Sequence, residues 1–235
     1  MKSSVFRFKQ FEVYQDRTAM KIGTDGVLLG AWAAADNPFR ILDVGTGTGL
    51  IALMLAQRYP EALIEAVEIE AGAAEQAHYN FQISPWKDRL HLVQTDFKDF
   101  QTDYRYDLIV SNPPFFDGKY LSDDSNRNWA RHNQKLSLEV LLQKSKSLLT
   151  EHGSLHLILP VQKEKELYEI AETTGFFLRQ ITYVKGRHDL PVKRFLVQMV
   201  QKPSEIQTNL LAIEIARHRY TKEYVFLTRD FYLKM

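Results

Sequence analysis

Residues 40–50 of the 235-residue chain read Arg-Ile-Leu-Asp-Val-Gly-Thr-Gly-Thr-Gly-Leu, and this stretch decides the fold. The run up to Val44 is apolar and β-branched, which predicts a short buried strand, and apolar residues recur at helical spacing from Leu50. Glycines at alternate positions let the chain turn sharply and let a ligand approach the backbone where a helix begins. The stretch therefore predicts a strand, a glycine turn and a helix.

Outward from this stretch, strands and helices alternate as far as about residue 160. Such alternation predicts right-handed crossovers and a parallel sheet with helices on both faces. We therefore expect an α/β, Rossmann-like, doubly wound sheet that is mostly parallel and has an antiparallel closing strand. The expected strands cover residues 63–68, 90–95, 106–111, 154–159, 176–185, 194–201 and 210–215, and the expected helices cover residues 71–81, 137–149, 163–174 and 222–233.

The chain shows no repeat and no obvious linker, so we expect a single domain over residues 1–235. Its core would span residues 37–202. Residues 1–36 would form an N-terminal decoration, and residues 203–235 a C-terminal extension. Residues 117–133 are polar without periodicity and predict a surface loop.

The composition excludes several classes of protein. The chain has no cysteine, so disulfides and cysteine nucleophiles are excluded, and no histidine spacing indicates a metal site. The longest uncharged apolar run, residues 27–35, is far short of the roughly 20 residues that a membrane helix needs. The N-terminus has no apolar signal region. We therefore expect a cytoplasmic protein without membrane contact, monomeric and without an obligate protein partner.

The charges are segregated along the chain, although the formal net charge is only +1. Residues 1–23 and 185–194 each carry a net charge of +3, whereas residues 36–112 carry −6. A basic surface could face a polyanion while an acidic interior holds a cationic ligand. Solvated faces that simply differ in charge remain an alternative.

Three carboxylates follow or end successive predicted strands: Asp43, Glu68 and Asp96. Open α/β sheets bind ligands at these carboxyl ends, where Glu68 could accept ribose hydroxyls and Asp96 an adenine amine. A cationic ligand tolerates an acidic pocket better than an anionic pyrophosphate does. The shifted pattern Gly47-x-Gly49-x-x-Ala52 also fits dinucleotide binding, so an NAD-dependent oxidoreductase remains open.

The motif Asn112-Pro-Pro-Phe115 ends the fourth predicted strand. Consecutive prolines fix φ, remove two N–H donors and hold the preceding residue extended. The Asn112 amide oxygen and the Pro113 carbonyl could accept both hydrogens of an exocyclic amine, and Phe115 could stack on the planar group that bears it. A strand-ending turn with Phe115 as a core residue is the alternative.

The glycine turn with its three acids resembles the S-adenosylmethionine (SAM)-dependent methyltransferases over roughly residues 40–160. Asn112 to Phe115 resembles the signature of the amino methyltransferases, with phenylalanine in place of the commoner tyrosine. Four further segments resemble bacterial valine-tRNA adenine-37 N6-methyltransferases: Phe8 to Phe11, residues 16–32, Ser84-Pro85-Trp86 and Phe231-Tyr232-Leu233.

This resemblance implies SAM as cofactor, a tRNA as partner and methyl transfer to the N6 of adenine 37. It implies that residues 37–202 are the catalytic core and that the N-terminal decoration, residues 1–36, closes over the cofactor site. It implies cofactor contacts by Asp43, Gly45, Gly47, Gly49, Glu68 and Asp96, with Thr24 near the methionine end of SAM. Without it, residues 23–26 read as a turn. Candidate RNA contacts are Arg127, Arg131 and Lys135 in the polar loop, and Lys193 and Arg194 in the closing pair.

Rival functions share parts of this pattern. A DNA adenine or protein glutamine methyltransferase would use the same Asn112 element, although a DNA enzyme normally needs a larger sequence-reading domain. An oxidoreductase gives the Asn112 element no role. An RNA-binding module with a vestigial SAM fold is disfavoured by the intact glycine turn. SAM's methyl group is already activated, and the amine proton leaves to solvent after methyl transfer, so we assign no general base.

Overall fold

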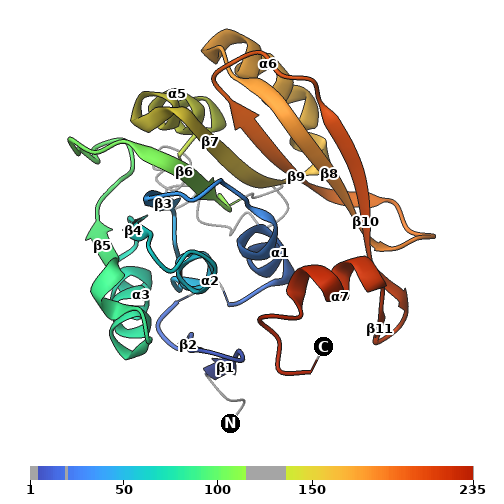
Figure 1. Cartoon of the computed structure of the whole chain (residues 1–235), viewed down its shortest axis with the longest axis horizontal. Helices are drawn as coiled ribbons and strands as arrows, with labels where there is room; N and C mark the ends of the chain where they lie inside the picture. The colour runs from blue at the N-terminus through green and yellow to red at the C-terminus, as the bar shows by residue number, and fades with distance from the viewer. Residues whose placement is uncertain (1–4, 19–20, 115–135, 235) are drawn as a thin grey trace, which may run out of the picture.

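The computed structural model describes residues 5–18, 21–114 and 136–234 (Figure 1). The expected loop over residues 117–133 lies outside these residues. The strands are β1 (Val5–Arg7), β2 (Glu12–Tyr14), β3 (Arg40–Val44), β4 (Leu63–Glu68), β5 (Leu90–Gln94), β6 (Tyr106–Ser111), β7 (Leu149–Pro160), β8 (Phe177–Arg187), β9 (Val192–Val200), β10 (Gln207–Ala216) and β11 (Arg219–Tyr220). The helices are α1 (Thr24–Trp32), α2 (Leu50–Arg58), α3 (Ala71–Ile83), α5 (Leu138–Leu148), α6 (Glu164–Thr174) and α7 (Lys222–Thr228).

The large sheet has the strand order β11-β10-β8-β9-β7-β6-β3-β4-β5. The pairs that involve β9 or β11 are antiparallel and the others are parallel, which confirms the predicted mostly parallel sheet. The antiparallel strand β9 lies inside the sheet, because β8 lies beyond it. Strand β10 then pairs in parallel with β8, from Gln207↔Gln180 to Glu214↔Arg187. Residues after 202 therefore enlarge the sheet.

Helices cover both faces of this sheet: α1, α2, α3 and α7 lie on one side, and α5 and α6 on the other (Figure 1). Neighbouring strand residues serve different cores. Ile41 packs into the core beneath α1 and α2, while Leu42 packs into the core beneath α5 and α6. Strands buried on both faces read as continuous apolar runs, which is why residues 40–44 and 106–111 were recognisable. The doubly wound architecture is confirmed.

Helix α1 packs on α2 through two glycines four residues apart. A Cβ atom built on Gly30 would lie 2.7 Å from Met54 Sδ, and one on Gly26 would lie 3.2 Å from Leu50 Cδ2. Residues four apart lie on one face of a helix, so the missing side chains let α1 approach the helix that follows the glycine turn. Residues 24–26 are thus the first turn of α1, and the expectation of a simple turn over 23–26 was wrong.

The two chain ends meet. Phe8 pairs with Tyr232 in an antiparallel bridge, and Lys9 N donates to Phe231 O at 2.8 Å. The terminal helix predicted over residues 222–233 begins as expected, but its predicted end is wrong. Helix α7 ends at Thr228, because the following residues turn to pair with the N-terminal segment.

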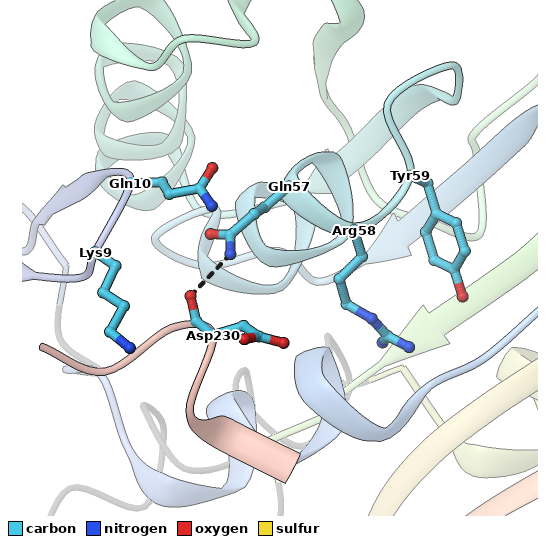
Figure 2. A pocket seen from close by; sticks show the side chains of 6 residues that line it. All are labelled: Lys9, Gln10, Gln57, Arg58, Tyr59 and Asp230. Carbon is cyan, nitrogen blue, oxygen red and sulfur yellow. Dashed lines mark hydrogen bonds between the residues drawn. The ribbon is translucent and has the colours of Figure 1, made fainter. Parts of the chain in front are cut away.

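A depression of about 540 Å³ lies beside this junction (Figure 2). In it, Gln57 Nε2 donates to Asp230 O at 2.9 Å. Helix α2 begins at the glycine turn and ends at Arg58, so this depression lies at the other end of the helix, roughly 13 Å along its axis. The depression is lined by Lys9, Gln10, Gln57, Arg58, Tyr59 and Asp230.

Two buried amides of α3 hold the N-terminal segment next to the glycine turn. Asn80 Oδ1 accepts from Tyr14 N at 2.9 Å, and its Nδ2 donates to Tyr14 O at 2.9 Å and to Thr48 O at 2.8 Å. Gln76 Oε1 accepts from the backbone N–H groups of Asp16 and Arg17 at 3.1 and 3.0 Å. One side chain, Asn80, therefore joins three elements: β2, α3 and the turn before α2.

We predict that Asn80→Ala destabilises the fold, because backbone groups of Tyr14 and Thr48 lose their partner. Each buried polar group left unpaired costs about 1–3 kcal/mol. Urea unfolding should report this loss. Gln82→Ala, on the exposed face of the same helix, is the matched control and should unfold like the wild type. Equal stability of both variants would show that Asn80 does not anchor the segment.

Candidate functional site

The strand register brings the predicted site residues to one edge of the sheet. Val44 of β3 lies opposite both Ser111 of β6 and Val67 of β4. The next residues along the chain, Gly45, Asn112 and Glu68, therefore lie at the same level, and Glu68 is the last residue of β4. Asp96 follows two residues after the end of β5, which pairs with β4. Segments more than 60 residues apart in sequence thus surround one position.

The glycine turn adopts a left-handed backbone at each glycine, with φ of 71° at Gly45, 59° at Gly47 and 82° at Gly49. Only glycine adopts such angles at little cost. A Cβ atom on Gly45 or Gly47 would meet nothing within 4 Å, whereas one on Gly49 would lie 2.5 Å from Phe81 Cε1. The first two glycines leave open space for a ligand, and the third permits packing against α3.

Asp43 holds the turn from inside the protein. Its carboxylate is fully buried, and Oδ2 accepts from Thr46 Oγ1 at 2.6 Å and from Ala52 N at 3.2 Å. The bond to Ala52 N serves one of the N–H groups that a helix leaves unpaired in its first turn. Burial raises the pKa of Asp43 from 3.8 to about 7, against the hydrogen bonds from Thr46 and Ala52. Its Oδ1 has no partner among the described residues.

Glu68 holds the same turn from the neighbouring strand. Its Oε2 accepts from Gly47 N at 2.8 Å, and its Oε1 accepts from Ile69 N and Glu70 N, both at 2.9 Å. A carboxylate has about four acceptor positions. Backbone donors occupy three of these positions, so Glu68 can accept one ribose hydroxyl without any change. It can accept a second hydroxyl only if its hydrogen bond with Gly47 N breaks.

Asp96 is part of a local turn at the end of β5. Its Oδ1 accepts from Lys98 N at 2.9 Å, and its Oδ2 lies 3.1 Å from Lys98 Nζ. Ile69 is a further side chain of this edge that was not predicted from the sequence. It directly follows Glu68 at the end of β4, the strand next to β5, and is 52% exposed. An exposed aliphatic group at a cleft edge can cover a planar ring. No periodicity in the sequence singled it out.

The Asn112 element begins where β6 ends. Ser111 Oγ donates to Val44 O at 2.8 Å, which ties this strand end to β3 just before the glycine turn. Asn112 is half-buried and Pro113 is buried. Asn112 is therefore fixed beside the turn by its neighbour. Phe115 lies outside the described residues.

The remaining candidates separate into two groups. Arg194 Nε donates to Asp25 Oδ2 at 2.8 Å, which ties the start of β9 to the first turn of α1, beside the exposed Thr24. Lys193 is exposed. The predicted RNA contacts Arg127, Arg131 and Lys135 lie outside the described residues.

The arrangement fits SAM, the cofactor that the resemblance implies. The open glycines and the free acceptor position on Glu68 form a cradle at the strand ends, and the buried Asp43, whose Oδ1 has no partner among the described residues, supports this cradle from inside. The acids suit the positive charge of a sulfonium. Among the described residues no group of three His, Cys, Asp or Glu could hold a metal ion.

Comparison with known proteins identifies relatives along the whole chain. Residues 20–173 match the model of the methyltransferase small domain. A tRNA1(Val) (adenine(37)-N6)-methyltransferase of Christiangramia forsetii is 48% identical, and 100% of each chain is covered. Proteins of the same name from Flavobacterium johnsoniae and Parabacteroides distasonis are 47% and 44% identical, with 98% and 100% of this chain and 100% of theirs covered.

Solved structures share the fold at low identity. A predicted O-methyltransferase from Agrobacterium tumefaciens aligns with a TM-score of 0.68 and 20% identity, over 88% of this chain and 96% of that chain. A glycopeptide N-methyltransferase complexed with SAM aligns with a TM-score of 0.57 and 14% identity, over 80% and 93% of the two chains. Both show a Rossmann-like methyltransferase fold.

We predict that Gly47→Ala and Gly49→Ala differ in kind. Gly47→Ala should lower the stability by only about 1–2 kcal/mol, the cost of a left-handed backbone at alanine. It also puts a methyl group into the open face of the turn. It should fold and bind SAM more weakly. Gly49→Ala also overlaps Phe81, so its loss of stability should be larger, and Phe81→Leu should partly restore it. Urea unfolding and SAM calorimetry measure the two effects; equal stability losses would contradict the separate roles.

We predict that Asp43 makes the fold less stable as the pH rises from about 4 to 7. In this window the folded protein keeps a proton on Asp43 that the unfolded chain has released, so the free energy of unfolding falls with rising pH. Asp43→Asn lacks this titration. As the pH rises, its free energy of unfolding should therefore increase relative to that of the wild type by up to about 1.4 kcal/mol per pH unit. Asp36→Asn, at an exposed site, is the control. Parallel pH curves for wild type and Asp43→Asn would refute the raised pKa.

Proposed function

The chain belongs to the methyltransferase small domain family and, over its full length, to the tRNA1(Val) (adenine(37)-N6)-methyltransferases; from this premise we propose that it methylates the exocyclic N6 of adenine 37 in a tRNA. SAM is the methyl donor. The observation that carries the proposal is the register of β6 and β3, which sets Asn112 beside the glycine turn. The group that would orient an amine thus lies next to the group that would hold the donor.

The cofactor is bound at the strand ends that carry acids. Gly45 and Gly47 offer open backbone, Glu68 one free acceptor position, and Asp96 a carboxylate beyond β5. Thr24 begins α1, whose first turn is tied to the start of β9 by the bond between Asp25 and Arg194. SAM, when bound, supplies a methyl group already activated on a sulfonium. These residues therefore need to hold and orient rather than to activate.

Asn112 and Pro113 act on the target base. The Asn112 amide oxygen and the Pro113 carbonyl each accept one hydrogen of the adenine amine, which leaves the nitrogen lone pair directed at the donor. Pro113 and Pro114 hold this geometry, because their rings fix φ and supply no competing N–H donor. The base has to leave its stack, and Phe115 offsets part of that cost by stacking on it. We assign no general base, and the amine proton passes to solvent.

The rival functions lose support. The same Asn112 geometry would serve a DNA adenine or a protein glutamine, but the relatives that match over the full length carry a tRNA enzyme's name. The oxidoreductase alternative rested on the shifted glycine pattern and on Glu68 as an acid that could bind a ribose. It leaves Asn112 and Pro113 without a role.

The tRNA is the expected partner. No helix in the described part of the chain is long and apolar enough to cross a membrane. Cytoplasmic localisation, a monomeric working form and a single domain remain part of the proposal. Sedimentation with and without tRNA tests the oligomeric state.

We predict that Asn112→Ala lowers methyl transfer about 10- to 100-fold, the cost of a lost hydrogen bond that orients the amine, while SAM affinity changes little. Asn112→Asp keeps an acceptor and should retain more activity. Single-turnover assays with folded tRNA, with the methylated nucleoside mapped, measure the chemistry, and calorimetry measures SAM binding. Asn209→Ala, exposed on β10, is the control.

Two outcomes would overturn the proposal. A wild-type rate for Asn112→Ala would remove this side chain from the reaction. Preferential methylation of duplex DNA or of a glutamine-containing peptide by the wild type would exclude tRNA as the substrate while leaving the amine-orienting role of Asn112 intact.

A further inference from the structure

The carboxyl edge of the large sheet is divided by charge. On one side of β6, the ends of β3, β4 and β5 carry the acids Asp43, Glu68 and Asp96. On the other side, the start of β9 carries Lys193 and Arg194, and the end of β8 carries Lys185 and Arg187. Asn112, at the end of β6, lies at the boundary between the two halves.

The basic half continues into a hairpin that the sequence analysis did not single out. Strands β10 and β11 are joined by Arg217 and His218, and β11 begins with Arg219. All three residues are exposed. Because Glu214 of β10 lies opposite Arg187 of β8, this tip extends beyond the sheet edge beside the β8–β9 hairpin (Figure 1). The strand register makes Asn112 level with Asn209 of β10. Four inter-strand steps of about 4.8 Å give about 19 Å across the sheet, and the eight residues from Asn209 to Arg217 add roughly 26 Å along the strand, so the tip lies on the order of 30 Å from Asn112.

The hairpin is held rigidly. His218 adopts a left-handed backbone with φ of 63°, and its N–H donates to Glu214 Oε1 at 3.2 Å. Beyond the tip, Thr221 Oγ1 donates to Ala212 O at 2.6 Å and Thr221 N to Ile213 O at 3.0 Å. A ligand that binds such a tip does not have to order the backbone, so little conformational entropy is lost.

The cations of the tip are available for a partner. Arg187 and Arg194 are neutralised by Asp189 and Asp25 at 3.0 and 2.8 Å. In the ranges that the structure describes, by contrast, neither the Arg217 nor the Arg219 side chain forms an ion pair or a hydrogen bond. Unpaired arginines on a rigid, exposed turn are suited to phosphate oxygens.

Building on the proposed function, we propose that the tip of the β10–β11 hairpin, residues 217–219, together with Lys193, binds backbone phosphates of the tRNA substrate on one side of the target adenine. The tip is too far from Asn112 to touch the reacting base. At roughly 3.4 Å per charge along one strand of a duplex, a separation on the order of 30 Å covers about nine phosphates, so a single folded RNA is long enough to contact both places. Residues 36–112, which form the other half of the edge, carry a net charge of −6 and repel the backbone, so the RNA is directed across the basic half.

The test compares two double variants that remove the same charge. Arg217→Ala/Arg219→Ala removes the tip, and Arg105→Ala/Arg179→Ala removes two exposed arginines near the opposite, amino edge of the sheet. Binding of folded, unmodified tRNA is measured by fluorescence anisotropy between 50 and 300 mM KCl. The tip variant should bind on the order of tenfold more weakly at low salt, with a salt slope reduced by about 0.9 for each phosphate that the tip no longer neutralises. SAM affinity and the single-turnover rate at saturating tRNA should stay at wild-type values.

Each other outcome decides against the inference. The inference would be overturned if the tip variant bound tRNA with the affinity and salt slope of the wild type, or if both double variants lost the same affinity. In either case, methylation of tRNA by the wild type would leave the proposed function standing. A wild type that binds no tRNA but binds vesicles with anionic phospholipid would assign the basic half to a membrane surface and overturn the inference. A wild type that binds SAM but methylates no tRNA would overturn the proposed function itself.

Discussion

Hydrogen bonds accepted by two carboxylates shape the glycine turn, and the other parts of the site depend on that turn. Asp43 accepts from Thr46 inside the turn and from Ala52 at the start of α2, while Glu68 accepts from Gly47 across the strand gap. The direction of α2 follows from this closure. Helix α1 packs on α2 through Gly26 and Gly30, and Asn80 ties the N-terminal segment to Thr48. A change at the turn therefore reaches elements that have no contact with the cofactor.

The charge pattern of the chain has a spatial meaning that the sequence order conceals. Residues 36–112 and 185–194 are far apart in sequence and opposite in charge. The strand order places their strand ends along one edge, with β6 between them. A cationic cofactor and a polyanionic substrate need opposite potentials, and at low ionic strength each half extends its field about 10 Å or more into solvent. Under the proposed function, the reaction takes place where the two fields meet, at Asn112.

Sequence reasoning succeeded where a local signal and the tertiary structure agree. Residues 63–68 and 106–111 are apolar runs between turn signals, and both are strands with these bounds. It failed where a distant segment decides: α7 ends early because the chain pairs with Phe8, and β10 is longer than expected because it pairs with β8. Gln76 and Asn80 were missed because polar residues on a helix normally face solvent. The role of a buried amide depends on groups far away in the sequence.

The difference between Asn80 and Asn112 shows how structural and functional polar groups can be separated by their bonding. Asn80 is fully buried and makes three hydrogen bonds with backbone groups, so nearly all of its capacity serves the fold. Asn112 is half-buried, and within the described residues its side chain makes no hydrogen bond. The prolines that follow it have no N–H to offer its amide oxygen. An amide held in place by its backbone, yet left with free acceptor capacity beside a ligand cradle, is suited to bind a group that arrives with the substrate.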